Sequence, residues 1–238
     1  MPDAEILAGV RTRPVAPRDA ASLILVDRSG RKPRVLMGKR HPGHVFMPGF
    51  MVFPGGRVEA ADRSMRVYGS LAAHTERNLL VRMARPSPGK ARALALCAIR
   101  ETFEETGILI GERGLGAPTT SSVHWRAFAE REVYPAPEPL SFVARAITPS
   151  RFPRRFDTRF FVADVSHIAG RTEGVTGPDS EFVETRWLTV EETKQENLAD
   201  ITRMILAEVE RRLKLGLEKD LPVPFFHEWR GTWRCDEI

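Results

Sequence analysis

The amino-acid sequence predicts an α+β fold in which strands and helices form separate layers. Three observations predict this class. Short apolar stretches bounded by turn residues alternate with longer stretches of helical periodicity. Their order along the chain is strands, helix, strands and helix, which favours an α+β or α/β/α layered domain over a helical bundle or a β-sandwich. Hydrophobic residues make up 42% of the 238 residues and charged residues 28%, as in ordinary globular proteins.

The strands are predicted, in chain order, from the apolar stretches that lie between turn residues. The first two, 21–26 and 34–39, flank a turn and form a hairpin. A loop rich in glycine, proline and histidine leads to a short strand at 50–53. Gly55 and Gly56 predict a sharp exit from that strand, because glycine adopts backbone angles closed to other residues. The remaining strands are expected at 108–110, 144–147, 160–165 and 182–188.

The helices are predicted from apolar residues that recur at helical spacing. One helix begins soon after Lys90 and ends at Gly107, since glycine in a left-handed conformation commonly ends helices. A proline-rich break at 86–89 separates it from a helical stretch at about 64–85. Two further helices are expected at 123–133 and 191–215.

Composition and charge exclude several classes of function. No apolar run reaches the roughly 18 to 20 residues that cross a bilayer, and the start of the chain lacks the basic and apolar segments of a secretory signal. We therefore expect a cytoplasmic protein that is not bound to a membrane. Cys97 and Cys235 are too few for a disulfide framework or a zinc site, and Cys97 is expected in the core. The net charge of +5 permits polyanionic ligands, but no motif interleaves aromatics and glycines, so no nucleic-acid partner is expected.

Three glutamates lie close together near the end of the helix that stops at Gly107. Glu101 and Glu105 are four residues apart and share one face, while Glu104 is adjacent and one turn from Arg100. A like-charge pair at this spacing costs roughly 0.2–0.5 kcal/mol. Either pairing with Arg100 or a hard divalent cation such as Mg²⁺, which prefers carboxylate oxygens, would offset that repulsion. The alternative is a solvated acidic helix face.

The wider pattern resembles the Nudix box. Residues 100–108 read Arg-Glu-Thr-Phe-Glu-Glu-Thr-Gly-Ile and resemble its second half, Arg-Glu-U-X-Glu-Glu-X-Gly-U, where U is bulky and aliphatic. Phe-Pro-Gly-Gly at 53–56 resembles its beginning. Thr102 departs from the pattern at the first U, and Asp62 stands where the family has glutamate. Residues 63–99, 37 in number, separate this acid from the arginine, where the family usually has seven.

The long interval predicts a helical insertion at about 63–93. One Nudix subgroup that carries such an insertion, the peroxisomal coenzyme A diphosphatases of the motif-19 type, is similar to this chain also at 44–49, 62–64 and 155–161. A related subgroup of coenzyme A hydrolases has an arginine where Val45 stands here.

The resemblance implies a single Nudix domain over residues 1–238, an α/β/α sandwich with a mixed sheet. The segment at about 191–238 would add a C-terminal helix and a tail. In that tail Trp229 and Trp233 lie among arginines, and they either stack on an adenine or pack their rings onto the domain.

The resemblance also implies roles for the residues of the box. Glu101, Glu104 and Glu105 would bind Mg²⁺ or Mn²⁺ together with the carbonyl of Gly55, and Arg100 would orient one of the glutamates. Gly55 and Gly56 would border the substrate.

Residues outside the box complete the predicted site. A further catalytic carboxylate is expected from a later loop, and Glu181 and Glu184 are the candidates. Arg155 and Arg159 lie at alternate positions of a predicted strand, so they either bind a substrate phosphate or form one wet, charged face.

Three functions remain open on this basis, and all of them involve a small nucleotide diphosphate. The first is hydrolysis of coenzyme A or acyl-coenzyme A to 3′,5′-ADP and phosphopantetheine. The second is a diphosphatase for ADP-ribose or another dinucleotide. The third is a Nudix module that senses a nucleotide without cleaving it. A homodimer is compatible with each of them.

Overall fold

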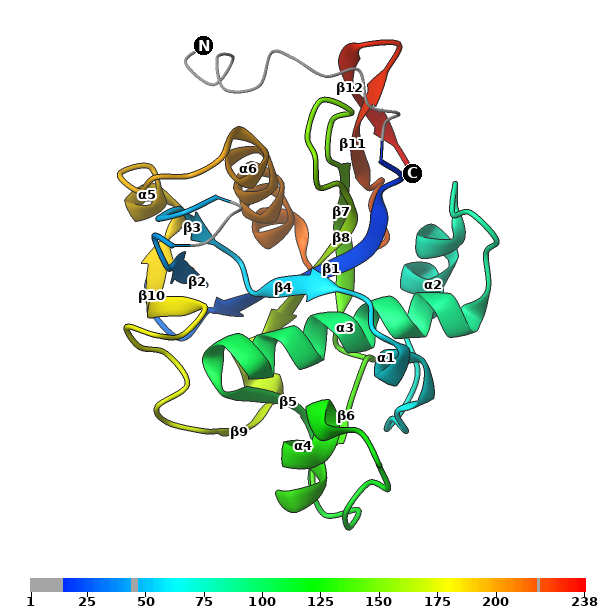
Figure 1. Ribbon diagram of the computed structural model, residues 1–238, viewed down its shortest axis with the longest axis vertical. Helices are drawn as coiled ribbons and strands as arrows, with labels where there is room; N and C mark the ends of the chain where they lie inside the picture. The colour runs from blue at the N-terminus through cyan, green and yellow to red at the C-terminus, as the bar shows by residue number, and fades with distance from the viewer. Residues whose placement is uncertain (1–14, 44–46, 218) are drawn as a thin grey trace.

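A nine-stranded sheet forms the centre of the computed structural model, which describes residues 15–43, 47–217 and 219–238 (Figure 1). Its path runs β10-β2-β1-β8-β7-β11-β12, with β3 beside β2 and β4 beside β1. The central strand β1 pairs in parallel with β8 and antiparallel with β2 and β4, so the sheet is mixed. The strands of this sheet are β1 (Arg18–Asp27), β2 (Arg34–Arg40), β3 (Met51–Val52), β4 (Gly55–Arg57), β7 (Ser141–Ile147), β8 (Phe156–Asp164), β10 (Phe182–Thr189), β11 (Pro224–Trp229) and β12 (Thr232–Glu237).

A second sheet and the helices surround this centre. The second sheet has the order β6-β5-β9. Its strands are β5 (Ile108–Glu112), β6 (Tyr134–Pro135) and β9 (Ile168–Arg171). The helices are α1 (Ala60–Ser64), α2 (Ala73–Leu80), α3 (Pro88–Thr106), α4 (Arg126–Glu130), α5 (Val190–Thr193) and α6 (Asp200–Leu215), with 3-10 turns η1 (Val123–Trp125) and η2 (Val165–His167).

Helices α3 and α6 cover opposite faces of the large sheet (Figure 1). Alternate residues of a strand point to opposite faces, and β1 follows this rule. Leu23 and Leu25 pack with the apolar side of α3, whereas Ile24 and Val26 pack with α6. The result is the predicted three-layer α/β/α arrangement with a mixed sheet.

The predicted strands are confirmed, and one prediction about their connections is wrong. Gly55 and Gly56 do not form a sharp exit, because they lie in β4 and pair with Ser22 and Ala21 of β1. Neither glycine has a positive φ. Glycine is required here because backbone and side chains approach closely, as the site geometry shows below.

The predicted helices exist, but several of their boundaries differ. The stretch at 64–85 holds the last residue of α1 and the short α2, and α3 begins at Pro88, within the proline-rich break and before the predicted start after Lys90. Ser87 caps the helix by accepting a hydrogen bond from the Lys90 amide, and proline at the first helical position fits this role. The stretch at 191–215 is divided between α5 and α6, and 123–133 between η1 and α4.

The C-terminal segment forms the hairpin β11–β12 rather than an irregular tail. Phe225 and Phe226 are buried, whereas Trp229 and Trp233 are about half exposed, so only the phenylalanines pack onto the core. Within the described ranges no helix has the length and apolarity needed to cross a bilayer. Of the predicted resemblance at 44–49, residues 44–46, including Val45, lie outside the described residues.

Candidate active site at the C-terminal end of helix α3

Arg100 is buried at the centre of the predicted box and is held by Asp62. Its Nε donates to Asp62 Oδ1 at 2.7 Å and one terminal nitrogen donates to Asp62 Oδ2 at 3.0 Å. Both side chains are almost completely buried, with exposed fractions of 2% and 0%. The same guanidinium also donates to Glu101 at 2.8 Å and to Glu104 at 3.0 Å. Asp62, the shorter acid of the box, therefore fixes the arginine that orients two of the glutamates.

The three glutamates of α3 differ in their surroundings. Glu105 is 4% exposed and accepts a hydrogen bond from the Gly55 amide at 2.8 Å. Burial raises its pKa well above the usual value, and repulsion from Glu181 and Glu101 adds to the effect. Burial also raises the pKa of Glu101 to about 7, against the opposing effect of Arg100. Glu104 is the most open of the three, with a side chain 32% exposed.

The two glycines of β4 make room for this cluster. A Cβ on Gly56 would lie 2.5 Å from the Glu101 carboxyl carbon, closer than atoms pack. A Cβ on Gly55 would lie 2.6 Å from the Ala21 carbonyl oxygen and 2.7 Å from Ser22 Cα. The absence of a side chain at Gly56 thus lets the Glu101 carboxyl group approach β4. Gly55 lets β4 lie against β1 with its amide directed at Glu105.

Glu181 reaches the same cluster from the loop before β10. Its negative charge raises the pKa of both Glu101 and Glu105, so it lies near them. Arg40 at the end of β2 forms an ion pair with it at 2.8 Å. The other candidate, Glu184, pairs instead with Lys39 at 3.7 Å on β2. Of the two predicted loop carboxylates, the structure brings Glu181 to the glutamates.

His124 joins the cluster although the sequence did not predict it. Its Nδ1 lies 2.7 Å from Glu104 Oε1, while Arg100 binds Oε2 of the same glutamate. His124 is in η1, twenty positions after Glu104, at the start of the stretch predicted to be helical at 123–133. No spacing rule connects the two residues, so only the folded loop reveals the contact.

Arg155 and Arg159 pair with groups other than the glutamates, and their binding of a substrate phosphate stays a prediction. Arg159 is 1% exposed and pairs with Asp19 at 2.9 Å and with Asp157 at 3.1 Å. Lys90, near the start of α3, pairs with the same Asp19 at 3.1 Å. The ion-pair network therefore lies beneath the opposite end of the helix from the box. The prediction of a wet, charged strand face is therefore wrong for Arg159, whose buried guanidinium pairs with carboxylates.

Arg155 is also committed to the protein itself. It donates to the backbone carbonyls of Thr148 and Val15, each at 2.9 Å. These contacts join β7, β8 and the segment before β1.

The carboxylate cluster has the donor chemistry of a hard divalent cation. Carboxylate oxygens are the ligands that Mg²⁺ and Mn²⁺ prefer, and mutual repulsion among the acids favours a bound cation. Among the described residues no group of three or more histidine, cysteine, aspartate or glutamate side chains is already arranged to hold a metal ion. Glu104 is engaged by Arg100 and His124, and Glu105 by the Gly55 amide, so binding requires these side chains to turn.

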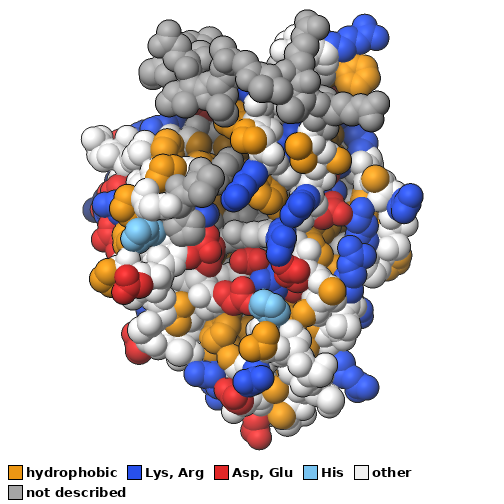
Figure 2. All heavy atoms as spheres, in the orientation of Figure 1, with side chains coloured by type: hydrophobic (Ala, Val, Ile, Leu, Met, Phe, Trp, Pro, Cys, Tyr) orange, Lys and Arg blue, Asp and Glu red, His pale blue; other side chains and the backbone are white. Residues whose placement is uncertain are grey.

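Acidic side chains gather near the middle of the molecular face that lies over α3, with basic side chains and a histidine beside them (Figure 2). This mixture of charges surrounds a hollow in the surface. A negatively charged diphosphate could be held by the basic groups while cations neutralise the glutamates.

Comparison with known proteins supports the resemblance seen in the box. The chain is 28% identical over 216 residues to nudix hydrolase 7 of Caenorhabditis elegans. This alignment covers 85% of this chain and 62% of that protein. It is 34% identical over 150 residues to acyl-coenzyme A diphosphatase NUDT19 of Gallus gallus. This second alignment covers 51% of this chain and 39% of that protein. The alignments thus span less than two thirds of these relatives. No protein-family model matches the chain.

The fold is also found among solved structures. A NUDIX hydrolase from Alicyclobacillus acidocaldarius superposes with a TM-score of 0.59 at 24% identity, covering 81% of this chain and 90% of that one. In its fold, in the box on α3 and in sequence along most of its length, the chain is thus similar to Nudix hydrolases.

Proposed function

We propose that the protein hydrolyses the diphosphate bond of a nucleotide derivative with Mg²⁺ or Mn²⁺ as cofactor. One observation carries the proposal: four carboxylates, three of them from one helix end, meet beside Gly55 and Gly56, and burial raises the pKa of two of them. Crowded acids of this kind destabilise a fold unless cations neutralise them. A module that only sensed a nucleotide would have no use for such repulsion.

In this mechanism each residue has one task. Glu101, Glu104 and Glu105 would hold the cation, the Gly55 carbonyl would be a further oxygen ligand, and Gly56 would border the substrate. The cation, when bound, neutralises charge on the diphosphate and lowers the pKa of a bound water. Arg100 keeps Glu101 and Glu104 oriented. Glu181 accepts the proton of the water that attacks one phosphorus, while the other phosphate leaves.

The substrate that we propose is coenzyme A or acyl-coenzyme A, cleaved to 3′,5′-ADP and phosphopantetheine. The similarity to an acyl-coenzyme A diphosphatase supports this substrate, as does the insertion that holds α2. ADP-ribose or another dinucleotide is the competing substrate.

A substrate panel with product analysis tests the proposal. Coenzyme A, dephospho-coenzyme A and ADP-ribose would be incubated with Mg²⁺ or Mn²⁺ and the products identified by mass. We expect coenzyme A to be cleaved fastest, since the other two lack the 3′-phosphate. Equal rates for all three compounds would contradict the coenzyme A assignment while leaving the diphosphatase activity in place.

A paired substitution tests the carboxylate cluster itself. Glu104→Gln keeps the size of the side chain and one acceptor oxygen but removes its charge, so we expect the rate to fall by roughly a hundredfold or more. Glu112→Gln, at the exposed end of β5, is the matched control and should keep the full rate. Full activity in Glu104→Gln with an unchanged circular dichroism spectrum would refute the proposed mechanism.

A further inference from the structure

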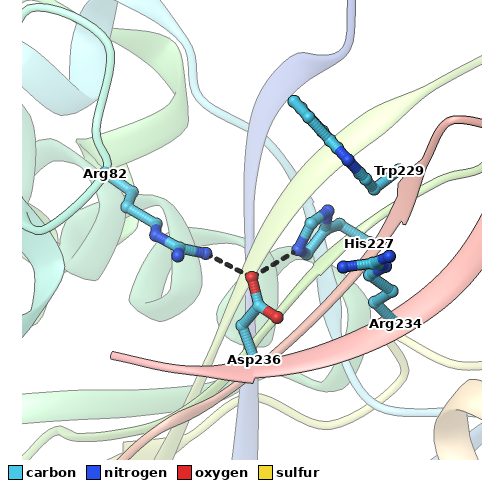
Figure 3. Close-up of a pocket in the computed structure, with 5 residues that line it drawn as sticks. All are labelled: Arg82, His227, Trp229, Arg234 and Asp236. Atoms are coloured by element: carbon cyan, nitrogen blue, oxygen red, sulfur yellow. Dashed lines mark hydrogen bonds and ion pairs between the residues drawn. The ribbon is translucent and has the colours of Figure 1, made fainter.

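A second cavity of about 400 Å³ lies between the β11–β12 hairpin and the loop that follows α2 (Figure 3). Its lining is rich in cations and includes one large aromatic ring: Arg82, His227, Trp229, Arg234 and Asp236. The loop of Arg82 leads into the N-terminal end of α3, whereas the glutamates lie at its C-terminal end. At 1.5 Å per residue, Lys90 and Glu104 are roughly 21 Å apart along the helix, so the two sites are separate.

Strand register explains why these side chains face the cavity together. His227 lies opposite Arg234, and Trp229 lies opposite Thr232 across the hairpin. Because side chains alternate between the faces of a strand, His227, Trp229 and Arg234 share one face. Trp233 and Glu228, which are paired with each other, lie on the other face.

Asp236 holds two side chains of the cavity in place. Its Oδ2 accepts hydrogen bonds from Arg82 at 2.6 Å and from His227 at 2.9 Å, as the dashed lines of Figure 3 mark. One carboxylate thus fixes two donors, and Arg234 has no carboxylate partner in the part of the chain that the structure describes. The cavity therefore has an excess of positive charge with donors that point inward.

Trp229 gives the cavity an aromatic wall. The residue is 52% exposed, so a large part of the indole ring is in contact with water and is not packed in the core. The guanidinium of Arg230 lies 5.7 Å from its ring centroid, which adds a further positive charge beside the ring. An aromatic ring next to guanidinium groups can stack with a nucleobase while the arginines bind its phosphate.

We propose that this cavity is a second ligand site that binds a mononucleotide. The base stacks on the Trp229 indole. The phosphate is bound by the guanidinium groups of Arg234 and Arg82, the second of which Asp236 holds in position. The site is independent of the carboxylate cluster and needs no divalent cation, so it is distinct from the proposed diphosphatase centre.

Isothermal titration calorimetry of the full chain with AMP, in buffer containing EDTA, tests the proposal. EDTA removes the divalent cations, which separates this binding from any at the glutamates. We expect one AMP per chain. Trp229→Ala should weaken AMP binding roughly tenfold, because it removes the stacking surface. Arg234→Gln, at an exposed position, should weaken it to a similar degree by removing the unpaired cation.

Trp233→Ala is the matched control, since this indole is also exposed but lies on the opposite face of the hairpin. It should bind AMP as the wild type does. Three results would overturn the proposal: no AMP binding at millimolar concentration, wild-type affinity in both Trp229→Ala and Arg234→Gln, or loss of binding in Glu104→Gln. The last result would place AMP at the glutamates. Since the titration contains no cation, loss of the diphosphatase activity would not affect its outcome.

Discussion

At the scale of single residues, the ion pair between Arg100 and Asp62 decides how the site is built. Two hydrogen bonds join these buried side chains, and the arginine also donates to Glu101 and Glu104 and so orients them. A buried charge that loses its partner keeps the cost of desolvation and gains nothing in return.

Removing the acid should therefore destabilise the protein. Asp62→Ala is expected to lower the free energy of unfolding by about 3 kcal/mol, because Arg100 stays buried with fewer partners. Urea denaturation measures this change. Glu191→Ala breaks an ion pair with Lys194 that is exposed on both sides, and it should leave the midpoint almost unchanged. Equal midpoints for Asp62→Ala and the wild type would show that the pair does not hold the site.

The two glycines of β4 should separate stability from activity. Gly55→Ala places its methyl group against the backbone of β1, which cannot move without breaking the sheet, so we expect a large loss of stability. Gly56→Ala brings its methyl group closest to the Glu101 carboxyl group and should displace that carboxylate, lowering activity more than stability.

Gly89→Ala provides the control for these two variants. It lies in the first turn of α3 with nothing within 4 Å of the added carbon, and it should raise stability by about 0.5 kcal/mol. Thermal melts and hydrolysis rates of the three variants would be compared. The reverse order, with Gly56→Ala the less stable of the two, would contradict this assignment.

His124 should compete with a cation for Glu104. Arg100 is buried and fixed, so the half-exposed histidine is the partner that leaves when Glu104 turns toward a metal ion. A hydrogen bond of this kind contributes about 1 kcal/mol, so His124→Ala should bind Mn²⁺ roughly fivefold more tightly. Electron paramagnetic resonance of free Mn²⁺ measures the affinity. Weaker binding in the variant would mean that His124 supports the cation instead.

At the scale of secondary-structure elements, Arg145 on β7 holds the insertion against the sheet. Its guanidinium binds both oxygens of Asp157 at 2.8 Å and the carbonyl of Arg82 at 3.1 Å, and it lies 4.4 Å from the ring centroid of Phe225. One side chain thus links β8, the loop after α2 and the C-terminal hairpin.

Loss of the contacts of the Arg145 guanidinium should destabilise the insertion locally, before the rest of the fold unfolds. Arg145→Lys keeps the charge but cannot reach all three partners, so amides of α2 and the loop after it should exchange with deuterium about tenfold faster. Mass spectrometry of the exchanged protein measures this. Amides in the centre of α3 should keep their wild-type rates, and uniform acceleration throughout would indicate global destabilisation instead.

The strands and the box helix were predictable because their signals are local. An apolar run between turns, a proline after a capping residue and a glycine that ends a helix each act within a few residues. The role of Gly56 was not predictable in this way, because it depends on Glu101, which approaches from another element. The hairpin at the C-terminus was missed since its outer strand is exposed along almost its whole length and lacks an alternating pattern.

At the scale of the whole molecule, we propose that the described chain is one domain. The C-terminal hairpin extends the sheet through β7, and the insertion packs between it and α3. The ion pairs of Arg159 could not be predicted from the sequence, because they depend on how distant strands pair. Its partners Asp19 and Asp157 come from two strands whose pairing is set by the complete sheet.

Cation binding should stabilise the entire fold, because it relieves repulsion among the glutamates. A ligand at a hundredfold excess over its dissociation constant adds about 2.7 kcal/mol to the free energy of unfolding. Saturating Mn²⁺ should therefore raise the melting temperature, and EDTA should reverse the rise. Glu104→Gln should show a smaller shift and Glu112→Gln the full one. An identical shift in Glu104→Gln would place the cation elsewhere.

The parallel pairing of β1 with β8 also governs how the protein is made. Arg18 lies beside Phe156, so the two central strands are separated by 156 − 18 = 138 positions of the chain. At about 5–20 residues per second, a ribosome needs roughly 7 to 30 seconds between them. Until β8 is made, the edge of β1 that pairs with it has no neighbouring strand, and this is when the nascent chain most needs protection by chaperones.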